Sequence, residues 1–131
     1  MSSSELVYNE RMKKILLIED DAFLKQLYAD ILKQEGYNVE VVDEGKTALE
    51  KIKENVWDLI LLDVLLPNMD GFTIIDNLNK EHKKPHCPII FMTNLDATDK
   101  DKEKLSSAND YWVKSSMSPP EFIEKVKNTI K

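Results

Sequence analysis

The strongest constraint on the fold is a regular alternation of two kinds of segment along the chain. Five short apolar runs, rich in branched and aromatic residues, occupy residues 15–18, 39–42, 59–62, 89–92 and 111–113. Each run has the length of a β-strand. The first, third and fourth runs are continuously apolar, which is typical of strands buried on both faces of a parallel sheet.

The segments that follow these runs carry apolar residues with helical spacing. Such stripes occupy residues 23–32, 48–56, 72–78 and 122–130. Gly36 stands at a helix-stop position after the first stripe, and the sequence SPPE at 118–121 fits a capping box that opens the last. The segment 96–108 has only three apolar residues among many charged ones, so it predicts a short, poorly anchored helix.

Strand and helix in strict alternation predict an α/β fold. We expect a single doubly wound, five-stranded parallel sheet flanked by helices on both faces. A length of 131 residues suits one domain. Residues 13–131 are expected to form it, and the polar residues 1–12 are expected to be a flexible extension.

Composition narrows the class of partner. The net charge of −6 argues against direct nucleic-acid binding, because phosphate backbones attract basic surfaces. No apolar run approaches the roughly 18 residues that a membrane helix needs, and the start lacks the pattern of a signal peptide. Cys87 is the only cysteine, which excludes an intramolecular disulfide. We therefore expect a cytoplasmic protein that does not bind membranes.

Charged and hydroxyl side chains stand where the predicted strands end. Glu19 and Asp20 follow the first strand, Asp63 follows the third, Thr93 the fourth and Lys114 the fifth. The carboxyl ends of parallel strands lie at the same edge of a sheet, where α/β proteins bind their ligands. The sequence therefore predicts that these five side chains gather, although they are far apart along the chain.

Such a cluster favours one kind of chemistry. Neighbouring carboxylates repel one another unless a cation compensates them, and oxygen ligands without nearby Cys or His favour Mg²⁺ over zinc or copper. Asp63 can then act as a nucleophile toward a phosphoryl group, with Lys114 and the metal stabilising the charge that develops. Taken alone, Asp63 is better explained as a turn acid, and Asp21 is assigned mainly to capping the following helix.

Four stretches make the chain similar to a known family. These are KILLIEDD at 14–21, LILLDVLLPNMDGF at 59–72, IIFMTN at 89–94 and NDYWVK at 109–114. Together they resemble the receiver domain of response regulators in two-component signalling, over nearly all of residues 13–131. The segment at 59–72 is the most specific of the four.

The resemblance implies a role for each site residue. Asp63 corresponds to the phosphoacceptor and Lys114 to the lysine beside it. Glu19 and Asp20 correspond to the metal-binding pair, which would hold Mg²⁺ together with Asp63 and the backbone carbonyl of Leu65. The domain would not be an enzyme acting on other substrates, since it would catalyse only its own phosphorylation and dephosphorylation.

The resemblance also implies a switch and its partners. Thr93 corresponds to the hydroxyl that moves toward the phosphoryl group, and Tyr111 to the aromatic residue whose rotamer follows. The phosphoryl donor would be a histidine kinase or a phosphotransfer protein. The signal would pass to a downstream protein or to an output domain outside this sequence. The face of the fourth helix, fifth strand and fifth helix would bind that partner or a second copy in a homodimer.

Two departures from the family pattern affect the site, and a third is a fourth helical segment that is slightly short and lacks the usual glycine before Ala108. Ser115 replaces the usual proline, which follows the lysine in a cis peptide. A cis bond before serine costs about 2.5–4 kcal/mol, so we expect either a trans bond with a rearranged loop or a strained cis bond. Asn94 replaces a small residue and should narrow access to the site. Apolar Leu65 and Leu95 flank it, which predicts a long-lived aspartyl phosphate because neither side chain can position an attacking water.

Two other functions remain open from the sequence. A degenerate receiver that binds partners without phosphorylation would explain Ser115, Asn94 and the unusual fourth helical segment at 96–108. A phosphatase with an aspartyl-phosphate intermediate would want a second acid two residues after the nucleophile, where Leu65 stands.

Overall fold

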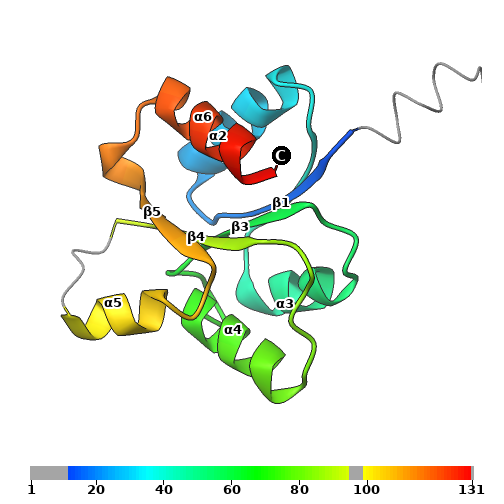
Figure 1. Cartoon of the computed structure of the whole chain (residues 1–131), viewed down its shortest axis with the longest axis vertical. Coiled ribbons are helices and arrows are strands. Elements are labelled where there is room, and N and C mark those ends of the chain that lie inside the picture. The colour runs from blue at the N-terminus through cyan, green and yellow to red at the C-terminus, as the bar shows by residue number, and fades with distance from the viewer. Residues whose placement is uncertain (1–11, 95–98, 131) are drawn as a thin grey trace, which may run out of the picture.

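Within residues 12–94 and 99–130, which the computed structural model describes, five parallel strands form one sheet (Figure 1). Their order is β2-β1-β3-β4-β5, and every neighbouring pair is parallel. The strands are β1 (Lys14–Ile18), β2 (Asn38–Val42), β3 (Leu59–Asp63), β4 (Ile89–Thr93) and β5 (Asp110–Val113). The expected fold class is confirmed.

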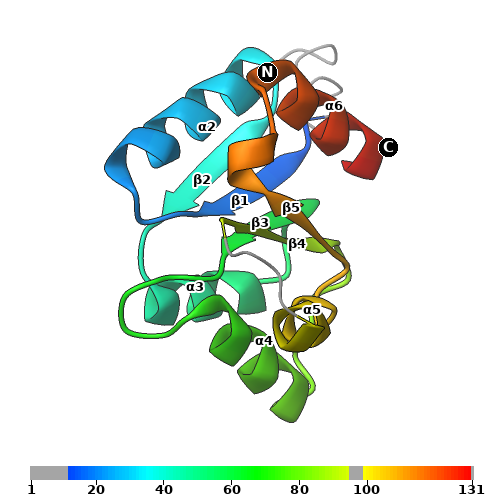
Figure 2. The same cartoon turned by 90° about the vertical axis from the view of Figure 1, so that its left-hand side faces the viewer.

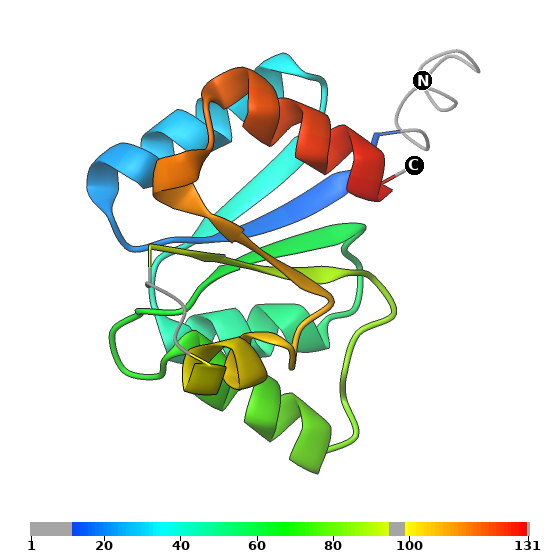
Figure 3. The same ribbon diagram turned by 60° about the vertical axis from the view of Figure 1, so that its left-hand side comes forward.

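Helices cover both faces of the sheet. They are α2 (Ala22–Gln34), α3 (Gly45–Lys53), α4 (Gly71–Lys80), α5 (Asp99–Leu105) and α6 (Pro119–Ile130). Figures 2 and 3 show α2 and α6 together on one side of the sheet, and α3, α4 and α5 on the other. None of the helices in the described part of the chain has the length and apolar composition that a bilayer crossing requires.

Each central strand contributes to two cores because its side chains alternate between the faces. Ile15 and Leu17 pack with α2 and α6, whereas Leu16 and Ile18 pack with α3 and α4. β3 and β4 are buried at every position. This double burial explains why the runs at 59–62 and 89–92 are continuously apolar.

The edge strand β5 also serves both cores. Trp112 packs edge-on against Phe122 of α6, with ring centroids 6.3 Å apart. Tyr111, its neighbour along the chain, is half-buried against the opposite core, which α3, α4 and α5 share. The two aromatic residues therefore anchor β5 to opposite helical layers.

Local side-chain bonds fix where two helices begin. Asp21 caps α2 by accepting a hydrogen bond from the Leu24 N–H at 2.9 Å. Ser118 and Glu121 bond reciprocally before α6: the Glu121 N–H donates to Ser118 Oγ, and the Ser118 hydroxyl donates to Glu121 Oε1. The capping box expected from SPPE at 118–121 is thus confirmed.

Two residues of the predicted apolar helix stripes, Phe23 and Val56, are exposed to solvent. Phe23 is 73% exposed in the first turn of α2, whose buried side chains are Tyr28, Ala29 and Leu32. Val56 is 48% exposed because α3 ends at Lys53, and Asn55 then adopts a left-handed conformation (φ 53°) that turns the chain away.

The weak fourth helix is confirmed as short. α5 spans only Asp99–Leu105, and Leu105 and Ala108 anchor this segment in the core. The expected extension, residues 1–12, lies outside the described residues except for Met12. Its flexibility and the domain boundary at residue 13 stay predictions.

The direction in which the chain winds changes beside β1, because β2 and β3 pair with its opposite edges. Ligand sites of such sheets lie in the crevice at this switch point. Gly71, the first residue of α4, packs closely there: a Cβ atom at this position would lie 2.6 Å from the Asp63 carbonyl oxygen. Its N–H donates to the Val64 carbonyl at 2.8 Å, which ties the start of α4 to the end of β3.

Candidate functional site

The carboxyl ends of the central strands surround a cleft of about 410 Å³. Glu19 follows β1, Asp63 ends β3, Thr93 ends β4 and Lys114 follows β5. The full lining is Glu19, Asp20, Asp21, Leu24, Asp63, Leu65, Thr93, Asn94 and Lys114. The structure therefore brings together the acids, the hydroxyl and the ammonium that the sequence placed at separate strand ends.

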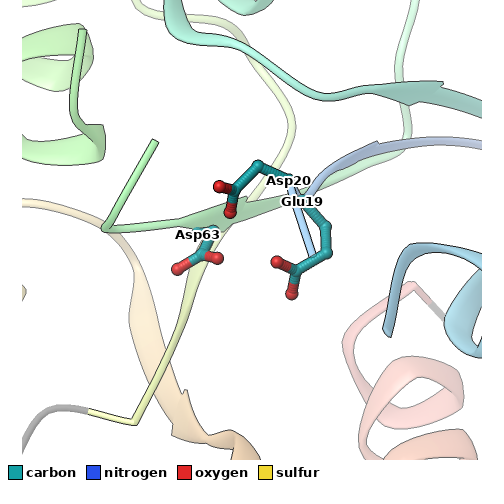
Figure 4. Close-up of side chains that lie close together, drawn as sticks. All are labelled: Glu19, Asp20 and Asp63. Atoms are coloured by element: carbon teal, nitrogen blue, oxygen red, sulfur yellow. The ribbon is translucent and has the colours of Figure 1, made fainter. Parts of the chain in front are cut away.

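Three carboxylates form the centre of the site. Glu19, Asp20 and Asp63 each offer an oxygen, and these oxygens lie within 4.8 Å of one another (Figure 4). Glu19 is 2% exposed and Asp63 6%, whereas Asp20 is exposed to solvent. The cluster is thus sealed on the side of the sheet and open on the side of the cleft.

Lys114 connects two of these acids. Its Nζ lies 2.8 Å from Glu19 Oε1 and 3.0 Å from Asp63 Oδ2, and all three side chains are nearly buried. Three carboxylates against one ammonium leave two negative charges uncompensated when all groups are ionised. A divalent cation balances this charge, and carboxylate oxygens are the ligands that Mg²⁺ prefers. The residues present therefore fit a magnesium ion.

Burial and mutual contact shift the proton affinities of this cluster. Burial raises the pKa of Glu19 to about 7, and its contact with Asp63 adds to the rise while Lys114 opposes it. For Lys114, burial acts to lower the pKa, but the hydrogen bonds to Glu19 and Asp63 outweigh it and the pKa is raised. Near neutral pH Lys114 therefore stays protonated, and Glu19 titrates within this range.

The loop after β3 is fastened to the start of α3. The Gly45 N–H donates to the Pro67 carbonyl at 3.0 Å, and Asn68 Nδ2 donates to Glu44 Oε2 at 2.9 Å. Leu65, expected to offer its carbonyl to a metal, donates its N–H to Asp63 Oδ1 at 3.2 Å. Sequence reasoning missed Glu44 and Asn68, although a helix-capping acid before Gly45 and an asparagine after a proline were visible signals.

The two expected switch residues lie on neighbouring strands. Thr93 is 1% exposed at the end of β4 and also lines the cleft. Tyr111 pairs in register with Phe91, two residues before Thr93, so alternation places Thr93 and Tyr111 toward the same face of the sheet. The ring of Tyr111 is half-buried against the core on that face.

The segment after Lys114 takes the trans alternative of our expectation. No cis peptide occurs among the described residues, and Lys114–Ser116 forms a single 3₁₀ turn, η1. The Ser115 N–H donates to Asn94 Oδ1 at 2.8 Å. The sequence pointed to Asn94 and Ser115 as separate departures, and the structure shows them bonded to each other.

Removing the ammonium should reveal how much the acids depend on it. With Lys114→Met, Glu19 and Asp63 lose their shared cation while still buried. We expect the free energy of unfolding, measured by urea titration without divalent cations, to fall by about 3 kcal/mol near pH 8. Near pH 5 the loss should be much smaller, because a carboxylate then takes up a proton.

A matched control for this variant is Lys25→Met. Lys25 pairs with Asp43 at 3.2 Å on the surface, so its loss should cost less than about 1 kcal/mol at either pH. Equal losses for the two variants, or a Lys114→Met loss independent of pH, would contradict the role of a buried bridging charge.

Glu19 should give the metal-free domain a characteristic pH dependence. Its pKa rises from 4.5 to about 7 on folding, so between these values the folded state binds more protons than the unfolded state. The free energy of unfolding therefore falls as pH rises through this window, by on the order of 2 kcal/mol from this group. Urea unfolding near pH 5 and pH 8 should show that Glu19→Gln lacks this decrease.

Glu124→Gln, at an exposed position of α6, is the control and should keep the wild-type pH profile. A Glu19→Gln profile that follows the wild type would show that Glu19 does not carry the proton.

Known proteins share both this sequence pattern and this fold. The model of the response regulator receiver domain family matches residues 15–127. The response regulator ArlR of Staphylococcus saprophyticus is 38% identical over 79% of this chain, which spans 46% of that protein. Hybrid signal transduction histidine kinase B of Dictyostelium discoideum is 33% identical over 91% of this chain, which spans 7% of that protein.

Solved structures agree. The receiver domain of the sensor histidine kinase PA1611 of Pseudomonas aeruginosa, with a magnesium ion in its active-site cleft, has a TM-score of 0.78 at 28% identity, covering 91% of this chain and 98% of that one. The BeF3-activated receiver domain of Klebsiella pneumoniae RstA has a TM-score of 0.78 at 30% identity, covering 90% and 98%. The chain therefore belongs to the response regulator receiver domain family, the phosphorylation-controlled switches of two-component signalling.

Proposed function

We propose that Asp63 is the phosphoacceptor of this receiver domain. The observation that carries the proposal is the position of Asp63: its carboxylate faces the open cleft, 3.0 Å from the Lys114 ammonium and within reach of two further acids. A nucleophile so placed can meet a phosphoryl donor from solvent while buried charges hold it in position.

The geometry supports direct transfer. A carboxylate oxygen of Asp63 attacks the phosphorus of a phosphohistidine, a new P–O bond forms, and the P–N bond to the departing imidazole breaks. Lys114, already beside Asp63 Oδ2, stabilises the negative charge on the phosphoryl oxygens. Glu19, Asp20 and Asp63, with the Leu65 carbonyl, would hold Mg²⁺, which when bound supplies further neutralisation of that charge.

The remaining assignments follow from this role. Thr93 and Tyr111 would report the phosphorylated state, since both face the same side of the sheet at its β4–β5 edge. The donor would be a cytoplasmic histidine kinase or phosphotransfer protein, and the domain would catalyse only its own phosphorylation and dephosphorylation. The surface of α5, β5 and α6 would engage a downstream protein, an output domain or a second copy.

A receiver that works without phosphorylation finds no support in the site. Two of the features that favour it, Asn94 and Ser115, lie beside a cleft in which Lys114 still contacts both acids. Such a module has no need to keep a buried ammonium between two carboxylates, because each buried charge costs desolvation energy.

Incubation with acetyl phosphate and Mg²⁺ tests the phosphoacceptor directly. The wild type should gain one phosphoryl group by intact-mass measurement, and Asp63→Asn should gain none because the amide is not nucleophilic. Asp76→Asn, on the exposed side of α4 where Asp76 pairs with Lys80 at 3.1 Å, should label like the wild type. Labelling of Asp63→Asn, or failure of the wild type to label, would count against the proposal.

The lifetime of the phosphorylated state should depend on the apolar rim of the cleft. Leu65 lines the cleft and is 64% exposed; Leu95, its expected counterpart, lies outside the described residues. Leu65→Gln introduces an amide that can position water, so dephosphorylation should become several-fold faster. Val56→Gln, exposed before the start of β3, should leave the decay unchanged. Equal decay in Leu65→Gln and the wild type would exclude this role.

A further inference from the structure

We propose that Asn94 is a positioning residue, which holds Lys114 against Asp63 through the backbone of Ser115. This inference rests on the proposed function only for the chemical role of Lys114. The contact itself is a hydrogen bond of 2.8 Å from the Ser115 N–H to Asn94 Oδ1. It joins the first residue after β4 to the second residue after β5.

The bond acts on the exposed turn that carries Lys114 and follows β5. Ser115 and Ser116 are exposed, so neither of their side chains packs in the core, whereas the Lys114 side chain runs from this turn into a buried pair of acids. Within the turn, the Met117 N–H donates to the Lys114 carbonyl at 3.3 Å. The bond from Asn94 joins the turn to a second strand, and this fixes the point from which the ammonium reaches Asp63.

The bond requires both residues. A proline at position 115 has no N–H to donate, and an alanine or glycine at position 94 has no side-chain acceptor. The two residues that depart from the family pattern therefore form one interaction, in which a side-chain acceptor directly after β4 fixes the turn after β5. The same contact links the residue after Thr93 to the residue after Lys114, so movement of one strand end is passed to the other.

The test compares Asn94→Ala, Ser115→Pro and their combination with a matched control. Asn109 Oδ1 accepts a hydrogen bond from the Ile89 N–H, also at 2.8 Å, at the opposite end of β4. Asn109→Ala therefore removes a bond of the same kind, far from the cleft. We would measure the phosphorylation rate with acetyl phosphate, amide hydrogen exchange at Ser115 and the backbone chemical shifts of Lys114–Ser116.

Asn94→Ala and Ser115→Pro should each slow phosphorylation by about fivefold, the effect of losing one neutral hydrogen bond. The combined variant should be no slower than the slower single variant, because both changes remove the same bond. In Asn94→Ala the Ser115 amide should exchange faster and the turn resonances should shift. Ser115→Ala retains the N–H and should keep its protection, and Asn109→Ala should phosphorylate at the wild-type rate.

Three outcomes would overturn the inference. One is an Asn94→Ala rate equal to or above that of the wild type, the result expected if Asn94 merely obstructs the cleft. The second is unchanged protection of Ser115 in Asn94→Ala, and the third is a rate in the combined variant that multiplies the two single losses. If the wild type accepts no phosphoryl group, the proposed function fails, and hydrogen exchange at Ser115 with the turn resonances still decides whether Asn94 holds Lys114 in place.

Discussion

The site depends on one buried ammonium. Lys114, which follows β5, contacts Glu19 at the end of β1 and Asp63 at the end of β3. Without its ammonium group, these two buried carboxylates would repel each other. The arrangement leaves an excess of negative charge facing the cleft, together with exposed Asp20. That excess makes the site receptive to a divalent cation, and the ammonium makes it receptive to a phosphoryl group. The three acids and the ammonium between two of them thus account for both properties.

The sheet explains why distant residues can be placed so closely. Four of its strands end at one edge, with the last residues of neighbouring strands in register or offset by one residue, so the side chain that follows each strand has a fixed place. Continuous apolar burial of β3 holds Asp63 rigidly, since every residue of that strand packs against a helix layer or another strand. Gly71 completes the support by allowing α4 to begin in contact with the Asp63 backbone.

Much of this architecture was predictable because it follows from periodicity. The apolar runs predicted the strands. Because parallel strands end at the same edge of the sheet, the sequence also predicted that Asp63, Thr93 and Lys114 lie together. The features that the sequence did not predict depend on the backbone path of exposed segments. Phe23 fits an apolar helical stripe yet lies in solvent, because the register of α2 is set by deeper side chains. The Asn94–Ser115 bond likewise depends on the trans path of a turn that the family pattern did not suggest.

The alternation of β5 couples the two helical layers mechanically. Trp112 packs against Phe122 of α6 on one face of the sheet, whereas Tyr111 packs against the core beneath α4 and α5 on the other. Because Tyr111 and Trp112 are adjacent on one strand, their movements are linked. If β5 tilts so that Tyr111 packs more deeply on one face, Trp112 moves away from α6 on the opposite face. If Asp63 accepts a phosphoryl group as proposed, a tilt of β5 would change the packing on both faces of the domain, and a partner bound to either face would oppose it.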